Sequence, residues 1–260
     1  MSTRIFMQSR RALAVALLPI ALASCTADGG FDTNAAVGLG VGAMQAATLS
    51  EDQVVEAASL SAAEYDKKSK VAPANSKYST RLARLTSGLG NAAGLSLNYK
   101  VYLTKDLNAF AMADGTVRVY SGLMDVMPDD QILSVIGHEI GHVKLKHSYK
   151  QLREAMMTDT AFKAVGSVGG NIGALTQGQL GQLAQVAVGA HFSQKDELAA
   201  DAFSVKTLNS MGKDPASMRR AIETLNAKAG DGGGGFLSSH PSNDARLANI
   251  DKAITKLSHP

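Results

Sequence analysis

Two histidines and a glutamate stand close together in the pentapeptide His138-Glu139-Ile140-Gly141-His142, which has the spacing H-E-x-x-H. In a helix, side chains four residues apart lie on one face, so both imidazoles can reach one tetrahedral Zn²⁺. Glu139 points about 100° around the helix, where it can contact the attacking water without binding the metal. Two imidazole ligands and a carboxylate general base are the arrangement of a zinc peptidase.

A catalytic zinc site needs a third protein ligand and one open position. Glu197 and Asp201 are four residues apart among alanines, and such a pair of like charges on one helix face is favourable only opposite positive charge. We therefore expect Glu197 to be the third ligand and Asp201 to accept an imidazole N–H and fix the ring orientation. The alternative is a solvated acidic helix face. Two other histidines fit less well: His147 is interpreted as a solvated helix end and His191 as a structural or surface residue.

The elements that would carry these residues are mostly helical. Apolar side chains at helical spacing predict a helix from about Asp130 to His147, with acidic residues at its positive end. A helix from Ser193 to Ser210 would carry the acidic pair. Further helices are predicted over 51–69, 77–89, from 214 onward and over 243–257, and strands over 98–103, 109–113 and 117–120, the last two joined by an Asp114-Gly115 turn.

Two segments are rich in glycine. Residues 164–190 contain seven glycines in an apolar context, which lowers the helix propensity. Two interpretations stay open for this segment: a loosely packed helical hairpin, or a mobile lid or surface for a membrane or partner. Residues 230–235 contain five glycines and one aspartate and predict a flexible loop.

The N-terminus has the order of an export signal. Three arginines precede an apolar run over 12–22, which is too short to span a bilayer as a helix. Residues 22–25 read Leu-Ala-Ser-Cys and look like a bacterial lipobox, and Cys25 is the single cysteine of the chain. We expect a lipoprotein signal peptide over 1–24 and lipidation of Cys25; the alternative is a plain signal peptide with a chance cysteine.

The remaining chain is predicted to be a flexible tether over 25–48 and one domain over 49–260. Of the 260 residues, 45% are hydrophobic, which excludes disorder over the whole length. The formal net charge of +3 comes from three arginines in 1–24, so the rest carries 23 basic and 23 acidic side chains and nucleic-acid binding is not expected. Thr26, directly after the cysteine, favours the outer membrane by analogy with lipoprotein sorting.

Further short motifs surround these candidate residues. In chain order they are Asn108-Ala109-Phe110-Ala111, Val119-Tyr120-Ser121-Gly122-Leu123, Phe192-Ser193-Gln194, Glu197-x-x-Ala200-Asp201, and Ser239-His240-Pro241 with Arg246. Together with H-E-x-x-H they resemble the pattern of the membrane-associated zinc peptidases that include the CAAX prenyl protease, HtpX and Oma1. The resemblance runs from about Leu49 to near the C-terminus, and the lipobox points to a lipid-anchored outer-membrane branch.

This resemblance implies a gluzincin-like α+β fold, mostly helical, with a small β-sheet beside the helix of the H-E-x-x-H motif. It also implies one Zn²⁺ per chain, held by His138, His142 and Glu197. Glu139 would act as the general base and then protonate the leaving amine.

The resemblance assigns further residues to the active site. Arg246 would stabilise the oxyanion or structure the site, and His240 would approach the zinc and hold the enzyme latent. The alternative for His240 is a helix-entry residue before Pro241. An extended substrate would pair with the strand formed by Asn108, Ala109, Phe110 and Ala111.

One position departs from the family pattern. The family has arginine where this chain has Gln194, followed by Lys195, so the level of activity is in question but the zinc ligands are not.

Three functions are compatible with these features. The first is a zinc metalloendopeptidase of the bacterial envelope that is lipid-anchored in the outer membrane and faces the periplasm. It would cleave unfolded or misassembled envelope proteins. The second is a periplasmic chaperone or assembly factor for outer-membrane proteins, working with their assembly machinery and holding a latent zinc site. The third, zinc used only for folding, is disfavoured because structural sites have four protein ligands.

Overall fold

The computed structural model describes residues 49–89, 95–158, 171–228 and 235–258. The predicted signal peptide, the tether, Cys25 and most of the 230–235 loop lie outside the described residues. The helices are α2 (Glu51–Lys68), α3 (Lys77–Thr86), α5 (Ser121–Val126), α6 (Asp129–Lys144), α7 (His147–Thr158), the 3₁₀ turn η1 (Ile172–Ala174), α9 (Gln177–Val188), α10 (Gln194–Ser210), α11 (Ser217–Lys228), α12 (Phe236–Ser239) and α13 (Asp244–Ser258). The strands are β1 (Asn98–Tyr102), β2 (Ala109–Ala111) and β3 (Thr116–Tyr120).

The predicted fold class is confirmed: a mostly helical domain contains one small mixed sheet, with strand order β1-β3-β2. β3 pairs in parallel with β1 and antiparallel with β2. The β2–β3 hairpin turns at Asp114 and Gly115, as the sequence predicted. Gly115 has a φ of 87°, a region that L side chains rarely adopt, and a Cβ there would lie 2.1 Å from the Ser96 carbonyl oxygen.

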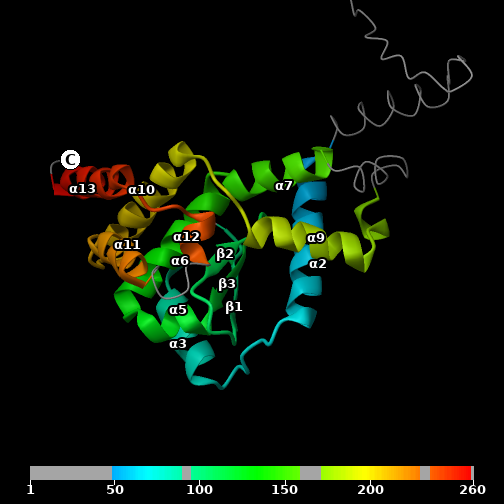
Figure 1. Ribbon diagram of the computed structural model, residues 1–260, viewed down its shortest axis with the longest axis horizontal. Helices are drawn as coiled ribbons and strands as arrows, with labels where there is room; N and C mark the ends of the chain where they lie inside the picture. Colours follow the sequence, from blue (N-terminus) through cyan, green and yellow to red (C-terminus); the bar gives the residue numbers. More distant parts are fainter. Residues whose placement is uncertain (1–48, 90–94, 159–170, 229–234, 259–260) are drawn as a thin grey trace, which may run out of the picture. The chain divides into compact units, whose positions relative to one another are not determined.

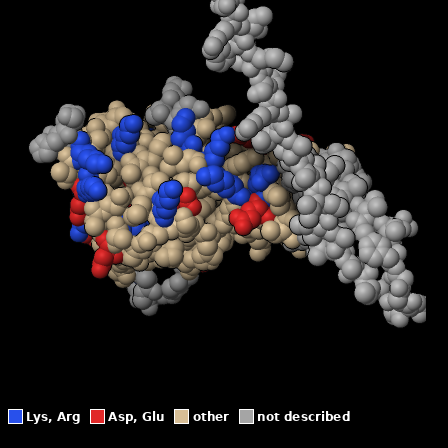
Figure 2. Space-filling model, turned by 90° about the horizontal axis from the view of Figure 1, so that it is seen from above, with Lys and Arg blue, Asp and Glu red and all other residues tan. Residues whose placement is uncertain are grey.

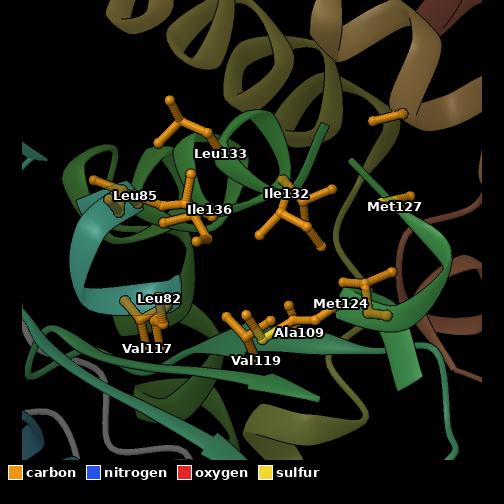
Figure 3. Close-up of a cluster of buried hydrophobic side chains, with 14 of the residues drawn as sticks. Leu82, Leu85, Ala109, Val117, Val119, Met124, Met127, Ile132, Leu133 and Ile136 are labelled. Carbon is orange, nitrogen blue, oxygen red and sulfur yellow. The ribbon is translucent and has the colours of Figure 1, made fainter. Parts of the chain in front are cut away.

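One face of the sheet supports the helix that carries the H-E-x-x-H motif. Side chains of β2 and β3 on this face meet apolar side chains of α3, α5 and α6 in one buried cluster (Figure 3). The labelled members are Leu82, Leu85, Ala109, Val117, Val119, Met124, Met127, Ile132, Leu133 and Ile136. Because side chains alternate along a strand, the neighbours of these strand residues point to the opposite face.

The opposite face of the sheet is aromatic and is covered by other helices. Tyr102, Phe110 and Tyr120 lie in a second buried cluster with apolar residues of α2, α7, η1 and α9. Figure 1 shows α2 and α9 beside the sheet on the side away from α6. The helix α2 begins at the predicted capping box, in which Ser50 and Gln53 exchange hydrogen bonds of 2.9 and 3.2 Å.

The helix α6 lies at the centre of the domain, between the sheet and α10 (Figure 1). Every residue from Gln131 to Val143 is buried, including both histidines and the glutamate of the motif. A helix that is buried all round must be apolar except where polar groups have partners. The polar groups of the motif therefore need partners from neighbouring elements.

Three predicted helix boundaries were wrong. The motif helix ends at Lys144 rather than at His147, because Lys146 adopts a left-handed φ of 60° and turns the chain into α7. The helix predicted over 77–89 ends at Thr86, and the one expected from 214 begins at Ser217.

The glycine-rich segment is described only from residue 171. This part contains η1 and α9, and α9 packs on α2, α7 and β2. None of the described helices is both long enough and apolar enough to cross a membrane.

Candidate metal centre

Four buried side chains from α6, α10 and the end of α12 meet at one point. They are His138 and His142 from α6, Glu197 from α10 and His240, which follows α12. One ligand atom from each lies within 4.8 Å of the others. We call these four residues the His–Glu cluster.

The donor atoms of the cluster face one another. The Nε2 atoms of His138 and His142 are 3.0 Å apart, and each lies 3.5 Å from a carboxylate oxygen of Glu197. Two imidazole nitrogens and a carboxylate form a donor set that Zn²⁺ prefers. The residues present thus fit a metal ion, with Glu197 at the position expected from the sequence.

The close approach of α6 and α10 brings Glu197 to the histidines, and two glycines of α6 allow it. A Cβ at Gly141 would lie 3.1 Å from the Cα of Ala200, and a Cβ at Gly137 would lie 2.8 Å from the Oγ of Ser204. A larger residue at either position would separate the two helices or strain the contact. One of these glycines is an unspecified position of the H-E-x-x-H motif.

Asp201 contacts the ring of His138 on the side away from the cluster. Its Oδ1 is 2.8 Å from Nδ1 of His138, so the ring donates its Nδ1–H and turns its Nε2 toward the cluster. Burial opposes ionisation of Asp201, but hydrogen bonds from Arg246 and His138 lower the pKa of its carboxyl. Asp201 thus lies where the sequence analysis expected it, as a charged acceptor for a motif histidine.

The pKa values of the two motif histidines shift in opposite directions. Burial opposes a charge on His138, yet the carboxylates of Asp201 and Glu197 raise its pKa to about 9. Burial and the charge of His138 lower the pKa of His142 well below its ordinary value. Burial also opposes the charge of Glu197, but hydrogen bonds from His138 and His240 lower its pKa. These opposite shifts favour positive charge on His138 and negative charge on Glu197.

Glu139 has the environment of a general base. It is buried, and burial raises the pKa of its carboxyl. Its Oε1 accepts no hydrogen bond from any described residue, and Nε2 of His240 lies 3.4 Å from it. The backbone N–H of Ala111 in β2 donates to the same carboxylate. One oxygen thus remains available to a water or a substrate beside the cluster.

His240, directly before Pro241, lies inside the cluster and is buried. Its Nδ1 is 2.9 Å from Oε1 of Glu197 and 3.3 Å from Nε2 of His138. Its ring stacks on Phe236, with centroids 4.4 Å apart and an interplanar angle of 20°. The geometry makes His240 a possible fourth donor for the same metal ion.

Arg246 of α13 contacts the carboxylates of the site. Its Nε and Nη2 donate to Asp201 over 2.8 and 2.7 Å, and its Nη1 lies 2.9 Å from Oε2 of Glu197. Nη1 also donates to the backbone oxygen of His240 over 3.1 Å. With its nitrogens engaged in this way, Arg246 is placed to structure the site. The other role expected from the resemblance, contact with a substrate oxyanion, is less compatible with these bonds.

The prediction for His147 was wrong. The residue was expected at a solvated helix end, but it is 7% exposed and its Nδ1 is 3.1 Å from Nδ1 of His142. Phe192 was named only as part of a family motif, with no role at the metal, and its ring stacks on His142 with centroids 3.8 Å apart. His191 is exposed, as expected, and so are Gln194 and Lys195.

The residues expected to bind substrate lie on an edge strand. Ala109, Phe110 and Ala111 form β2, and Asn108 precedes it; all four are buried. The carbonyl oxygen of Ala111 accepts a hydrogen bond from Ser148 over 3.2 Å. The N–H of this residue reaches Glu139, so the expected substrate strand lies directly beside the cluster.

Comparison with known proteins identifies the family. Residues 76–254, which include the whole His–Glu cluster, match the model of peptidase family M48. The chain belongs to this family. This chain is 42% identical to the metalloprotease LoiP of Escherichia coli strain K12 over 243 residues, which cover 92% of this chain and 95% of LoiP.

Two further relatives support the assignment. The metalloprotease YcaL of the same strain is 40% identical over 243 residues, which cover 93% of this chain and 96% of YcaL. The β-barrel assembly-enhancing protease of that strain is 26% identical over 187 residues, 68% of this chain and 38% of the relative. The family resemblance drawn from the motifs is confirmed, and the chain is a metalloprotease of family M48.

Proposed function

We propose that this chain is a zinc-dependent metalloendopeptidase, anchored by lipid in the bacterial envelope, that cleaves unfolded or misassembled envelope proteins. The observation that carries the peptidase assignment is the convergence of His138, His142 and Glu197 beside the free carboxylate oxygen of Glu139.

His138, His142 and Glu197 would hold one zinc ion. When bound there, Zn²⁺ supplies Lewis acidity toward the scissile carbonyl and toward water. Glu139 takes the proton of the attacking water on its free Oε1 and passes it to the leaving amine. Burial favours this role, because a raised pKa brings a carboxylate closer to the working pH of a general base.

The surrounding residues position these groups. Asp201 orients the ring of His138, and Arg246 ties Asp201 to Glu197. An extended substrate would add a strand at β2, where main-chain hydrogen bonds bind a peptide with little regard to its sequence. Such binding suits unfolded proteins, because their backbone is accessible.

His240 would be the fourth ligand of a resting state. Structural zinc sites are closed by four protein ligands, whereas catalytic sites leave one position open. His240 must therefore leave the cluster before substrate binds. The same observation favours a second candidate function, a chaperone or assembly factor for outer-membrane proteins with a latent zinc site.

The envelope location rests on the sequence. Cys25 in its lipobox would carry the membrane anchor, and the name of one relative, a β-barrel assembly-enhancing protease, supports a link to outer-membrane protein assembly. Nucleic acid is not expected as a partner. On the face shown in Figure 2, basic side chains are scattered among uncharged and acidic ones and do not form a continuous stripe.

Bound zinc and casein cleavage, measured together on the full chain purified in detergent, test the proposal. Glu139→Gln removes the base but keeps the shape of the side chain, and the exposed Glu223→Gln is the matched control. One zinc in every protein, with cleavage lost only in Glu139→Gln, supports the peptidase. Zinc without cleavage in the unchanged chain points to latency or to the chaperone, and His240→Ala is then the next test. The absence of zinc would contradict both functions.

A further inference from the structure

We propose that His147 and Asp196 act as a positioning pair that fixes the ring of His142 and thereby sets the metal affinity of the His–Glu cluster. This inference rests on the proposed function, because it requires that the cluster holds a metal ion.

The two ring nitrogens of His142 face different neighbours. Nε2 faces the cluster, 3.0 Å from Nε2 of His138 and 3.5 Å from Oε1 of Glu197. Nδ1 points away from the cluster and lies 3.1 Å from Nδ1 of His147. His147 is thus the hydrogen-bond partner on the far side of this ring.

The positions of the protons follow from this geometry. A neutral imidazole has one N–H and one lone pair, and a metal ion takes the lone pair. If Nε2 of His142 binds the metal, Nδ1 carries the hydrogen and donates it to Nδ1 of His147. The other nitrogen of His147, Nε2, must then carry a hydrogen, and Oδ1 of Asp196 lies 3.2 Å from this nitrogen.

Asp196 is itself held in place at the beginning of α10. Ser193 caps this helix: its hydroxyl donates to Oδ2 of Asp196 over 2.7 Å and accepts from the backbone N–H of Asp196 over 3.2 Å. Asp196 directly precedes Glu197. The first turn of α10 thus supplies two carboxylates. Glu197 belongs to the cluster, and Asp196 faces His147 on the far side of His142.

The chain reversal after α6 brings His147 to this position. Lys146 has a left-handed φ of 60°, which is uncommon for a residue other than glycine, and α7 begins at the next residue. Phe192 stacks on the face of the His142 ring, with an interplanar angle of 22°. The hydrogen bond fixes the ring in its plane, and the stacking fixes the tilt.

The two motif histidines are thus held differently. His138 donates directly to the carboxylate of Asp201, whose charge is balanced by Arg246. A second carboxylate in direct contact with His142 would add negative charge to a buried site that already contains several carboxylates. With His147 as the intermediate acceptor, the charge of Asp196 lies one ring farther away, on a side chain that is 32% exposed.

Zinc affinity by chelator competition, together with the visible absorption of the Co²⁺ form, tests the inference on the full chain. His147→Phe keeps a ring but removes the acceptor, and we expect a 10- to 100-fold loss of zinc affinity and a changed Co²⁺ spectrum. His147→Gln can both accept and donate, and should bind zinc within a few-fold of the unchanged chain. Asp196→Ala should lose about 10-fold, because the carboxylate that faces Nε2 of His147 is gone.

Leu152→Ala is the control for stability alone. Leu152 is buried in α7 without contacting the cluster, so this variant should unfold at lower temperature but keep its zinc affinity and Co²⁺ spectrum. If His147→Phe does not fold, Asp196→Ala decides, because its side chain is partly exposed. Unchanged affinity and spectrum in Asp196→Ala or His147→Phe would overturn the inference. Failure of the unchanged chain to bind zinc would instead overturn the proposed function, and this is visible without any variant.

Discussion

Arg246 and Asp201 form a two-pronged ion pair, with both side chains fully buried and nitrogen–oxygen distances of 2.7 and 2.8 Å. Asp201 also accepts the hydrogen bond of His138. The C-terminal helix α13, which carries Arg246, is thus connected through one carboxylate to a histidine of the H-E-x-x-H motif.

The first prediction concerns this pair. Arg246→Met should lower the free energy of unfolding by about 3–5 kcal/mol, because it removes the buried guanidinium that pairs with the carboxylates of Asp201 and Glu197. Urea unfolding of the metal-free protein measures this. Arg219→Met is the matched control: Arg219 pairs with Asp251 between α11 and α13, but is 36% exposed, so its loss should cost less than about 1 kcal/mol. Equal losses in the two variants would contradict the prediction.

The second prediction concerns the contact of α6 with α10. Gly141→Ala should weaken zinc binding and destabilise the fold by about 1–3 kcal/mol, since the new Cβ pushes against Ala200 and separates Glu197 from the histidines. Zinc affinity and thermal unfolding measure both effects. Gly178→Ala, in the exposed first turn of α9, should leave zinc affinity unchanged and slightly stabilise its helix. Tight zinc binding by Gly141→Ala would show that the helices adapt.

The third prediction concerns pH. Burial opposes the charge of Asp66, but hydrogen bonds from Arg118, Lys100 and Tyr102 outweigh it and lower the pKa of its carboxyl. A lowered pKa in the folded state contributes stability above the unfolded pKa of about 3.9, and this contribution is lost as pH falls through the folded pKa. Asp66→Asn should therefore cost about 3 kcal/mol at pH 7, because Arg118 is buried, and progressively less below pH 4.

Urea unfolding of both proteins between pH 3 and 7 measures this dependence. Asp125→Asn is the control: Asp125 is exposed and lies 4.0 Å from Lys77. Its effect should stay small at every pH. A cost of Asp66→Asn that does not change with pH would count against the ion pair as its source.

The fourth prediction concerns His240. His240→Ala should open the fourth position of the cluster, raise the rate of casein cleavage several-fold and weaken zinc binding by the loss of one donor. Cleavage rate and zinc affinity are measured on the same preparation. His191→Ala, at an exposed position, is the control and should change neither. Loss of cleavage with zinc retained would instead place His240 in the reaction itself.

The metal-binding residues could be predicted because each pair of them lies close together in the sequence. His138 and His142, like Glu197 and Asp201, are each four residues apart, and helical geometry alone places each pair on one face. The remaining question was whether the two helices meet, and the resemblance to a known family answered it before the structure did.

His147 could not be predicted in the same way. Its position depends on the left-handed conformation of Lys146, and no glycine or asparagine signals this reversal in the sequence. A continuing helix would have placed it off the metal-facing stripe. The parallel pairing of β1 with β3 was equally hidden, since only the β2–β3 hairpin has a local turn signal.

The beginning of α10 has a consequence for sequence change. Ser193, Asp196, Glu197 and Asp201 each contribute through their angular position on this helix. Insertion of one residue between Ser193 and Glu197 would rotate the cap by about 100° relative to the carboxylates while barely changing the helix length. The catalytic apparatus should therefore tolerate many substitutions along the exposed side of α10 but almost no change in the residue count of its first two turns.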